Sequence, residues 1–205
     1  MHEKYFIHRD VKPDNFLMGL NDKSNILHVV DMGLAKRYYD PETKRHLAYR
    51  NDKSLTGTAR YASLHAHLGE ELSRRDDFEA IGYTMVYLYT GFLPWQNLCM
   101  EDKKERYEKI KEMKLKTTNE ELCFGCPKEF VKYMEYVRCL EFKEKPDYEY
   151  MEKLFTDLAH KENICLTDNL YDWSIRATVI KSFPHVYDFI DYPETQPLNK
   201  QGKFM

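Results

Sequence analysis

Two short apolar runs on either side of a turn open the pattern of hydrophobic and polar positions. The runs cover residues 16–18 and 26–30, and the turn between them contains Gly19, Asn21 and Asp22. This arrangement is typical of a β-hairpin. The second run ends at an acid, Asp31. Residues 36–60 are polar and show no sustained period, so we expect a long irregular segment there, of the kind that usually carries function.

Four later segments have apolar residues three and four positions apart, which predicts four helices. The first is apolar nearly all round and should be buried. The second, in residues 101–116, has one narrow apolar stripe and should lie on the surface. Pro127 opens the third helix, and Asp147 is a candidate N-cap for the fourth. The expected inward residues are Phe78, Ile81, Met85 and Leu88, then Tyr107, Ile110 and Met113, then Phe130, Val131, Met134 and Val137, and last Tyr150, Met151, Leu154, Phe155 and Leu158.

Composition narrows the class of protein. The 205 residues carry 31 Lys and Arg against 34 Asp and Glu, a net charge of −3, which gives no electrostatic reason to expect nucleic-acid binding. A chain of this length with 42% hydrophobic residues can form one compact domain. Five irregularly spaced cysteines and the lack of a signal-peptide pattern favour a cytoplasmic or nuclear protein, or both. Gly91 and Pro94 interrupt the longest uncharged run, so we expect no membrane span.

The densest chemical signal is the string of residues 8–15, His-Arg-Asp-Val-Lys-Pro-Asp-Asn, followed by Asp31-Met32-Gly33. Transfer of a γ-phosphoryl group needs a carboxylate base, a cation near the phosphate and oxygen ligands for Mg²⁺. Asp10 would be the base, and Lys12 would reach the phosphate. Asn15 and Asp31 would hold magnesium, while Gly33 would let the backbone turn away. We therefore predict binding of ATP and Mg²⁺ through Lys12, Asn15 and Asp31.

This string resembles the catalytic loop of the protein kinases, and a lysine two residues after the base is similar to the serine/threonine class. Further stretches resemble the casein kinase I family in particular. They are Tyr49-Arg50, residues 55–63 (Leu-Thr-Gly-Thr-Ala-Arg-Tyr-Ala-Ser), residues 67–69 and 73–77, Leu93-Pro94-Trp95-Gln96, residues 145–148 and Asp172-Trp173. The absence of Ala-Pro-Glu near residue 63 also suits that family. Met32 departs from its usual phenylalanine, and Ser63-Leu64-His65 departs from its pattern after Ala62.

The resemblance implies roles for four residues outside the catalytic loop. Thr58 would hydrogen-bond Asp10 and Lys12, and Asp77 would anchor the catalytic loop from the central helix. Arg60 and Arg106 would form a site for the acidic or phosphorylated groups that the family prefers in its substrates. We interpret the neighbouring Lys103 and Lys104 as part of a solvated helix face, since acids interleave them.

Two other clusters invite metal binding but are interpreted as structural. Cys123 and Cys126 have the spacing of half a zinc site, without a second pair at finger spacing. His65 and His67 offer two imidazoles, and we expect neither a nearby carboxylate nor a third ligand. We interpret these cysteines as ordinary thiols and these histidines as structural residues.

The resemblance implies an α+β, mainly helical fold: a protein-kinase-like C-terminal lobe with a short catalytic hairpin and four to five main helices. We assign this lobe to residues 1–176 and an extended or poorly ordered extension to residues 177–205. The sequence contains no G-x-G-x-x-G loop and no strand lysine of the small lobe, so we expect a truncated kinase with weak or no activity alone. An apolar face would then be open to a partner.

Two functions follow from these features. The first is a casein kinase I-like protein serine/threonine kinase that transfers the ATP γ-phosphate to acidic or pre-phosphorylated protein substrates. The alternative is a catalytically silent kinase lobe that binds acidic or phosphorylated partners through Arg60 and Arg106. An intact set of catalytic residues favours the first, and the missing small lobe favours the second.

Overall fold

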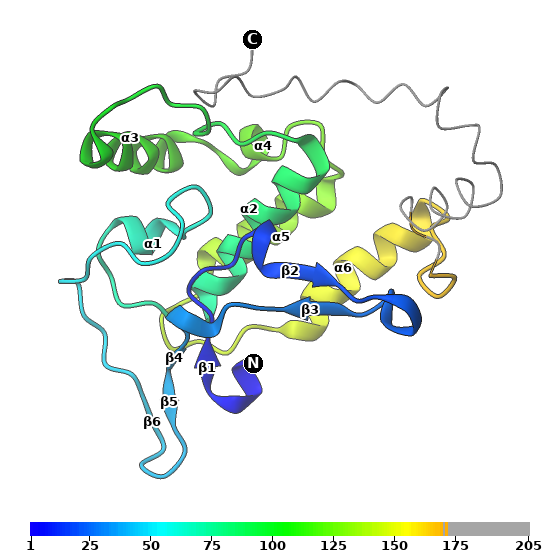
Figure 1. Cartoon of the computed structure of the whole chain (residues 1–205), viewed down its shortest axis with the longest axis horizontal. Helices are drawn as coiled ribbons and strands as arrows, with labels where there is room; N and C mark the ends of the chain where they lie inside the picture. The colour runs from blue at the N-terminus through cyan, green and yellow to red at the C-terminus, as the bar shows by residue number, and fades with distance from the viewer. Residues whose placement is uncertain (170, 172–205) are drawn as a thin grey trace. The chain divides into compact units, whose positions relative to one another are not determined.

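The structure, a computed structural model, describes residues 1–169 and 171. Residues Met1–Ile164 form one compact unit. Within it, small antiparallel sheets come first along the chain and helices follow (Figure 1). The extension expected at residues 177–205 lies outside the described residues, as does Trp173.

Three two-stranded antiparallel sheets come from the first 46 residues. The middle one is the hairpin of β2 and β3, in which Phe16 pairs with Val29 and Met18 with Leu27, so the predicted hairpin is confirmed. The other pairs join β1 to β4 and β5 to β6. The strands are β1 (Phe6–Ile7), β2 (Phe16–Met18), β3 (Leu27–Val29), β4 (Lys36–Arg37), β5 (Tyr39–Asp40) and β6 (Arg45–His46).

The described unit contains the four predicted long helices. The buried α2 packs against α5, and α5 packs against α6, while the one-turn α1 packs against α3 (Figure 1). Their shared core includes Tyr83, Trp95 and Met134, each at most 1% exposed. The helices are α1 (Leu64–His67), α2 (Arg74–Thr90), α3 (Lys103–Lys116), α4 (Asn119–Leu122), α5 (Lys128–Cys139) and α6 (Tyr148–Lys161).

The helix boundaries follow the expected capping chemistry. Asp147 accepts a hydrogen bond from the backbone N–H of Tyr150 and so caps α6, as predicted. Pro127 stands just before α5, where its missing N–H costs nothing. Gly91 ends α2 in the left-handed conformation, with a φ of +73°.

The buried face of α2 differs from the prediction. Leu88 is 67% exposed, whereas Asp76, Asp77 and Glu79 are each at most 4% exposed. Periodicity assigns apolar residues to the core, but these acids are buried because they hold groups that arrive from distant parts of the chain. Residues 36–60 also differ, since β4, β5 and β6 lie within them. Ladders of two residues are too short to show a period.

No helix among the described residues is long and apolar enough to cross a membrane.

All five cysteines have free thiols. Cys123 is buried, and burial raises the pKa of its thiol to about 12, so the thiol is inert at neutral pH.

Candidate active site

The catalytic string forms a tight loop between β1 and β2. Arg9 takes a left-handed backbone conformation with a φ of +69°, and Pro13–Asn15 form one 3-10 turn. Two backbone N–H groups of the loop donate to the buried carboxylate of Asp77 on α2: His8 N–H to Oδ2 at 2.8 Å and Arg9 N–H to Oδ1 at 2.9 Å. The central helix therefore holds the backbone on which Asp10 is mounted.

Asp10, Lys12 and Thr58 form a hydrogen-bonded triangle. Asp10 Oδ1 accepts hydrogen bonds from the backbone N–H and the hydroxyl of Thr58, both at 2.8 Å. Asp10 Oδ2 lies 2.9 Å from Lys12 Nζ, which also lies 3.3 Å from the Thr58 hydroxyl. The carboxylate is 8% exposed. Residues 48 positions apart in the sequence thus fix the orientation of one carboxylate.

These partners set the charge of the site. Burial opposes ionisation of Asp10, but hydrogen bonds from Lys12 and Thr58 outweigh it and lower the pKa of the carboxyl. The same pairing with Asp10 raises the pKa of Lys12. At neutral pH the site therefore contains an ionised carboxylate beside an ammonium group.

Asn15 and Asp31 flank the hairpin: Asn15 directly precedes β2, and Asp31 lies two residues beyond the end of β3. The backbone N–H of Val30 donates to the carbonyl of Asn15 at 3.0 Å, so the residue before Asp31 is bonded to Asn15 itself. The Asn15 amide donates to the carbonyl of Asp10 at 2.9 Å, which directs its own oxygen elsewhere. The left-handed residue of the turn is Asp31, with a φ of +59°, and not Gly33 as expected.

Gly33 has a different function from the one predicted. Its N–H donates to Asp31 Oδ1 at 3.2 Å, and a Cβ at this position would lie 3.1 Å from that oxygen. Glycine therefore leaves room for the Asp31 carboxylate to fold back over the turn. This contact fixes the carboxylate at the end of β3.

The donor set suits a hard cation. Asn15 offers an amide oxygen and Asp31 a carboxylate, the oxygen ligands that Mg²⁺ prefers, and Mg²⁺ needs only one or two protein ligands when phosphates supply others. The charge of Asp31 also contributes to the raised pKa of Lys12. The residues therefore fit a complex of Mg²⁺ with a polyphosphate.

A comparison with protein families agrees with this geometry. The family model described as protein kinase domain matches residues 1–164. The chain belongs to the protein kinase family. The matched range covers the compact unit. It includes all the proposed catalytic and magnesium-binding residues, which are Asp10, Lys12, Asn15, Asp31 and Thr58. As a class, protein kinases transfer the γ-phosphoryl group of ATP with Mg²⁺ bound.

Arg60 and Arg106 of this kinase line one cavity of about 410 Å³, together with Asp14, Trp95 and Gln96. Both arginines are half-buried, and the Arg60 guanidinium lies 6.0 Å from the centroids of the Tyr61 and Tyr87 rings. The structure thus brings together two cations from distant parts of the sequence.

Lys103 and Lys104, by contrast, are exposed at the start of α3 and line a different groove, alongside His67 and Glu108. The Lys103 amine lies 5.5 Å from the centroid of the Tyr107 ring. This placement suits the solvated helix face expected for the lysines.

Lys114 is a residue of the kinase that sequence reasoning missed. Its side chain is 1% exposed, and its amine donates to the carbonyls of Ala59 and Ala62, on either side of Arg60. The rings of Tyr83 and Trp95 lie 4.6 Å and 5.0 Å from the amine. Lys114 therefore holds the segment that carries Thr58 and Arg60. A lysine in a charged helix gives no sequence signal for such a role.

His65 corrects another expectation. Two carboxylates, those of Asp76 and Glu79, lie within 4 Å of its ring, whereas the sequence led us to expect none nearby. His67 does have a structural role, since its Nε2 lies 3.0 Å from the carbonyl oxygen of Ala59. Burial lowers the pKa of His67 to about 4 and keeps it neutral.

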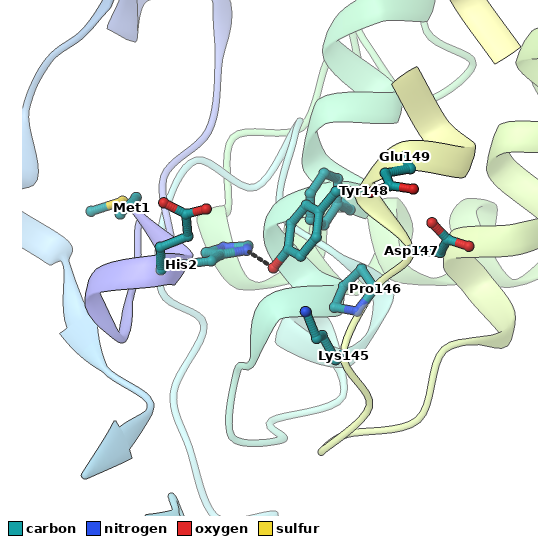
Figure 2. A pocket seen from close by; sticks show the side chains of 9 residues that line it. Met1, His2, Lys145, Pro146, Asp147, Tyr148 and Glu149 are labelled. Atoms are coloured by element: carbon teal, nitrogen blue, oxygen red, sulfur yellow. Dashed lines mark hydrogen bonds between the residues drawn. The ribbon is translucent and has the colours of Figure 1, made fainter. Parts of the chain in front are cut away.

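Another cavity is lined by none of the catalytic residues. It has a volume of about 780 Å³ and is lined by Met1–Glu3, Phe78 and residues 145–149 (Figure 2). His2 at its edge bonds both the Tyr148 hydroxyl, at 3.1 Å, and Asp77 Oδ2, at 2.9 Å. His2 therefore supports the same carboxylate that anchors the catalytic loop.

Proposed function

We propose that this chain is the catalytic lobe of a protein serine/threonine kinase of the casein kinase I type, which phosphorylates acidic or already phosphorylated proteins. The hydrogen-bonded triangle of Asp10, Lys12 and Thr58, beside the oxygen ligands of Asn15 and Asp31, is the observation that carries the proposal. The stretches that resemble the casein kinase I family support the finer assignment.

In this proposal Asp10 orients a serine or threonine hydroxyl and accepts its proton. The hydroxyl oxygen bonds to the γ-phosphorus as the bond from that phosphorus to the bridging oxygen of ADP breaks. Lys12 would offset negative charge on the transferred group, while Thr58 keeps Asp10 in position. Magnesium, held by Asn15 and Asp31, would neutralise charge on the phosphates.

The test is transfer of labelled γ-phosphate from ATP to casein-like acidic peptides. We expect the 205-residue chain to be slow, because it has no G-x-G-x-x-G loop over the phosphates. Its rate should nevertheless exceed that of Asp10→Asn and should fall to background with EDTA. Asp22→Asn, in an exposed turn, is the control and should keep the wild-type rate. Equal incorporation by wild type and Asp10→Asn would disprove the proposal.

Substrate preference is tested at Arg60 and Arg106. Guanidinium groups bind phosphate and carboxylate through paired, charge-assisted hydrogen bonds. We expect the double variant Arg60→Gln, Arg106→Gln to lose the preference for a pre-phosphorylated peptide over its unphosphorylated form. The matched control, Lys103→Gln with Lys104→Gln, removes the same charge from exposed positions and should retain the preference. An equal loss in both double variants would assign the preference to net charge and not to this cavity.

A second candidate function is binding without catalysis. It is favoured by the cavity of Arg60 and Arg106, whose lining includes neither Asp10 nor the proposed magnesium ligands Asn15 and Asp31. Phosphopeptide binding that requires both arginines, in a protein whose transfer rate equals that of Asp10→Asn, would support this candidate over the kinase.

A further inference from the structure

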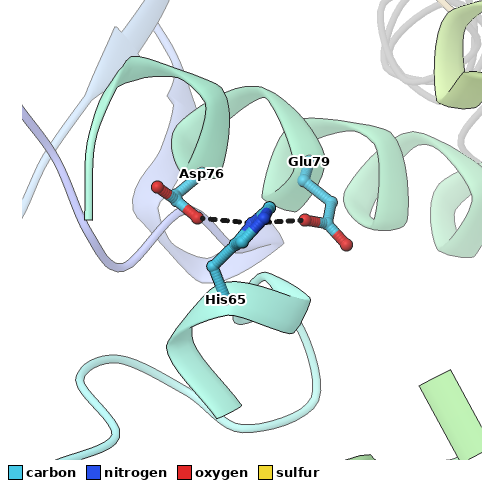
Figure 3. A group of neighbouring side chains, drawn as sticks. All are labelled: His65, Asp76 and Glu79. Carbon is cyan, nitrogen blue, oxygen red and sulfur yellow. Dashed lines mark ion pairs between the residues drawn. The ribbon is translucent and has the colours of Figure 1, made fainter. Parts of the chain in front are cut away.

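A histidine and two buried acids meet where α1 packs against α2, apart from the catalytic set. His65 lies on α1, and Asp76 and Glu79 lie one turn apart at the start of α2, with the imidazole between the two carboxylates (Figure 3). His65 Nδ1 is 3.4 Å from Asp76 Oδ1 and 3.9 Å from Glu79 Oε2. One nitrogen or oxygen atom from each residue lies within 4.8 Å of the other two.

His65 Nδ1 is buried and has no hydrogen-bond partner. Its separations from the two acids exceed the roughly 2.7–3.2 Å of a good N–H···O bond. A buried polar atom without a partner is uncommon in folded proteins and requires an explanation. Here that nitrogen lies near one carboxylate oxygen of Asp76 and one of Glu79, and such negatively charged oxygens also bind metal cations.

Other contacts hold both carboxylates in place. The far oxygens, Asp76 Oδ2 and Glu79 Oε1, accept hydrogen bonds from backbone N–H groups at 2.7 Å and 3.2 Å. The guanidinium nitrogens nearest to these carboxylates also face the far oxygens, at 3.9 Å from Asp76 Oδ2 and 3.8 Å from Glu79 Oε1. The near oxygen, Asp76 Oδ1, accepts a hydrogen bond from one hydroxyl at 2.6 Å. This oxygen still has a second lone pair that could bind a metal. The donors are Ser73 and Leu64, the guanidinium groups belong to Arg75 and Arg138, and the hydroxyl is that of Ser63.

We propose that His65, Asp76 and Glu79 bind one divalent transition-metal ion of the Zn²⁺ class. Ligand bonds of about 2.0–2.2 Å around a tetrahedral ion place neighbouring ligand atoms roughly 3.3–3.6 Å apart. The 3.4 Å separation of His65 and Asp76 falls in this range, and that of His65 and Glu79 is slightly longer. Imidazole combined with carboxylates suits Zn²⁺ better than Mg²⁺, which takes oxygen ligands. Water would complete the coordination.

The ion would join α1 to α2 directly after the segment that contains Thr58 and Arg60. His65 lies just beyond Ser63, whose hydroxyl already bonds Asp76. A metal bond at His65 would therefore fasten the same junction from the other side. Its effect is stabilisation of this junction, independent of the magnesium ligands at Asn15 and Asp31.

The test is a Zn²⁺ titration of the full chain against a chelating dye, with millimolar Mg²⁺ present to occupy the magnesium ligands. We expect one Zn²⁺ per wild-type chain and a melting temperature that rises with Zn²⁺. His65→Asn should lose both effects, while His67→Asn, a matched change on the same helix, should retain them. Equal Zn²⁺ binding by wild type and His65→Asn, or no binding by wild type, would overturn the proposal.

A spectrum of the wild-type protein tests the site without any variant, in case His65→Asn fails to fold. Co²⁺ in place of Zn²⁺ should show the visible bands of nitrogen and oxygen ligands, without the near-ultraviolet charge-transfer band of a thiolate. A thiolate band would assign the metal to Cys123 and Cys126, or to another thiol, and would overturn the proposal.

Discussion

Asp10 shows how single contacts set the chemistry of this kinase. Two hydrogen bonds from Thr58 and the ion pair with Lys12 keep its carboxylate ionised despite its burial. The hydroxyl of Thr58 does not touch a reacting atom in the proposed mechanism. It acts through Asp10 as a positioning group, so its removal should change the pH profile as well as the rate.

Thr58→Val tests this positioning role. A hydrogen bond to a charged group contributes about 1.5–3 kcal/mol, so we expect the transfer rate to fall about tenfold to a hundredfold. Because the Thr58 hydroxyl lowers the pKa of Asp10, its loss should raise that pKa and move the acid limb of the rate profile to higher pH. Thr58→Ser should restore both rate and profile. A slower variant with an unshifted acid limb would indicate a purely structural role.

Lys114 gives a prediction for stability. Burial lowers the pKa of its amine to about 7, against 10.5 for the free side chain. Between these values the unfolded chain binds more protons than the folded one, so folding stability from this group rises with pH. The neutral amine still has two N–H groups for the carbonyls of Ala59 and Ala62.

Denaturation of wild type and Lys114→Met from about pH 7.5 to about pH 10 measures this linkage. We expect wild-type stability to gain on the variant as pH rises, by at most about 1.4 kcal/mol per pH unit. Lys116→Met, on the exposed end of the same helix, should show no such trend. A constant difference between wild type and Lys114→Met would show that the amine keeps an ordinary pKa.

At the scale of elements, the segment that carries Thr58 must approach the catalytic loop closely. Gly57 has a φ of +86°, and a Cβ there would lie 2.4 Å from the carbonyl oxygen of Arg9. Gly91 has a similar φ of +73°, but a Cβ there would meet no other atom within 4 Å. Substitution at either glycine would strain the backbone, but only substitution at Gly57 would also cause a steric clash.

Substitution of each glycine by alanine tests that contact. Both variants should lose about 1–2 kcal/mol of stability from the left-handed backbone alone. Gly57→Ala should lose more, and its transfer rate should fall at least about tenfold because Thr58 is pushed away from Asp10. Gly91→Ala should keep the wild-type rate. Equal stability and equal activity in the two variants would mean that the segment does not rest on Arg9.

The long helices were predictable because each repeats its apolar positions over about two to three turns. The short ladders around β4 to β6 and the one-turn helices α1 and α4 were not, since two to four residues cannot show a period. The catalytic loop was readable because its residues are contiguous. The surroundings of Lys114 and His65 were not, because they depend on which distant backbone and carboxylate groups the fold brings to them.

At the scale of the whole molecule, a polar catalytic loop is held on a helical core by buried polar side chains. Asp77 anchors the loop, and Lys114 holds the segment with Thr58 and Arg60. Each of these side chains lies more than 50 positions away in the sequence from the groups that it binds. The catalytic loop is therefore positioned by α2, and the segment with Thr58 and Arg60 by α3. This arrangement supports the proposed roles of Asp10 as base and of Arg60 in the anion site.

The most direct measurement is to map the phosphorylated residues of casein by mass spectrometry after incubation with ATP, Mg²⁺ and the chain. We expect new phosphoserine and phosphothreonine next to acidic or already phosphorylated residues with wild type, and none above background with Asp10→Asn. Phosphorylation confined to tyrosine, or the same sites and amounts with both proteins, would contradict a serine/threonine kinase that uses Asp10 as its base.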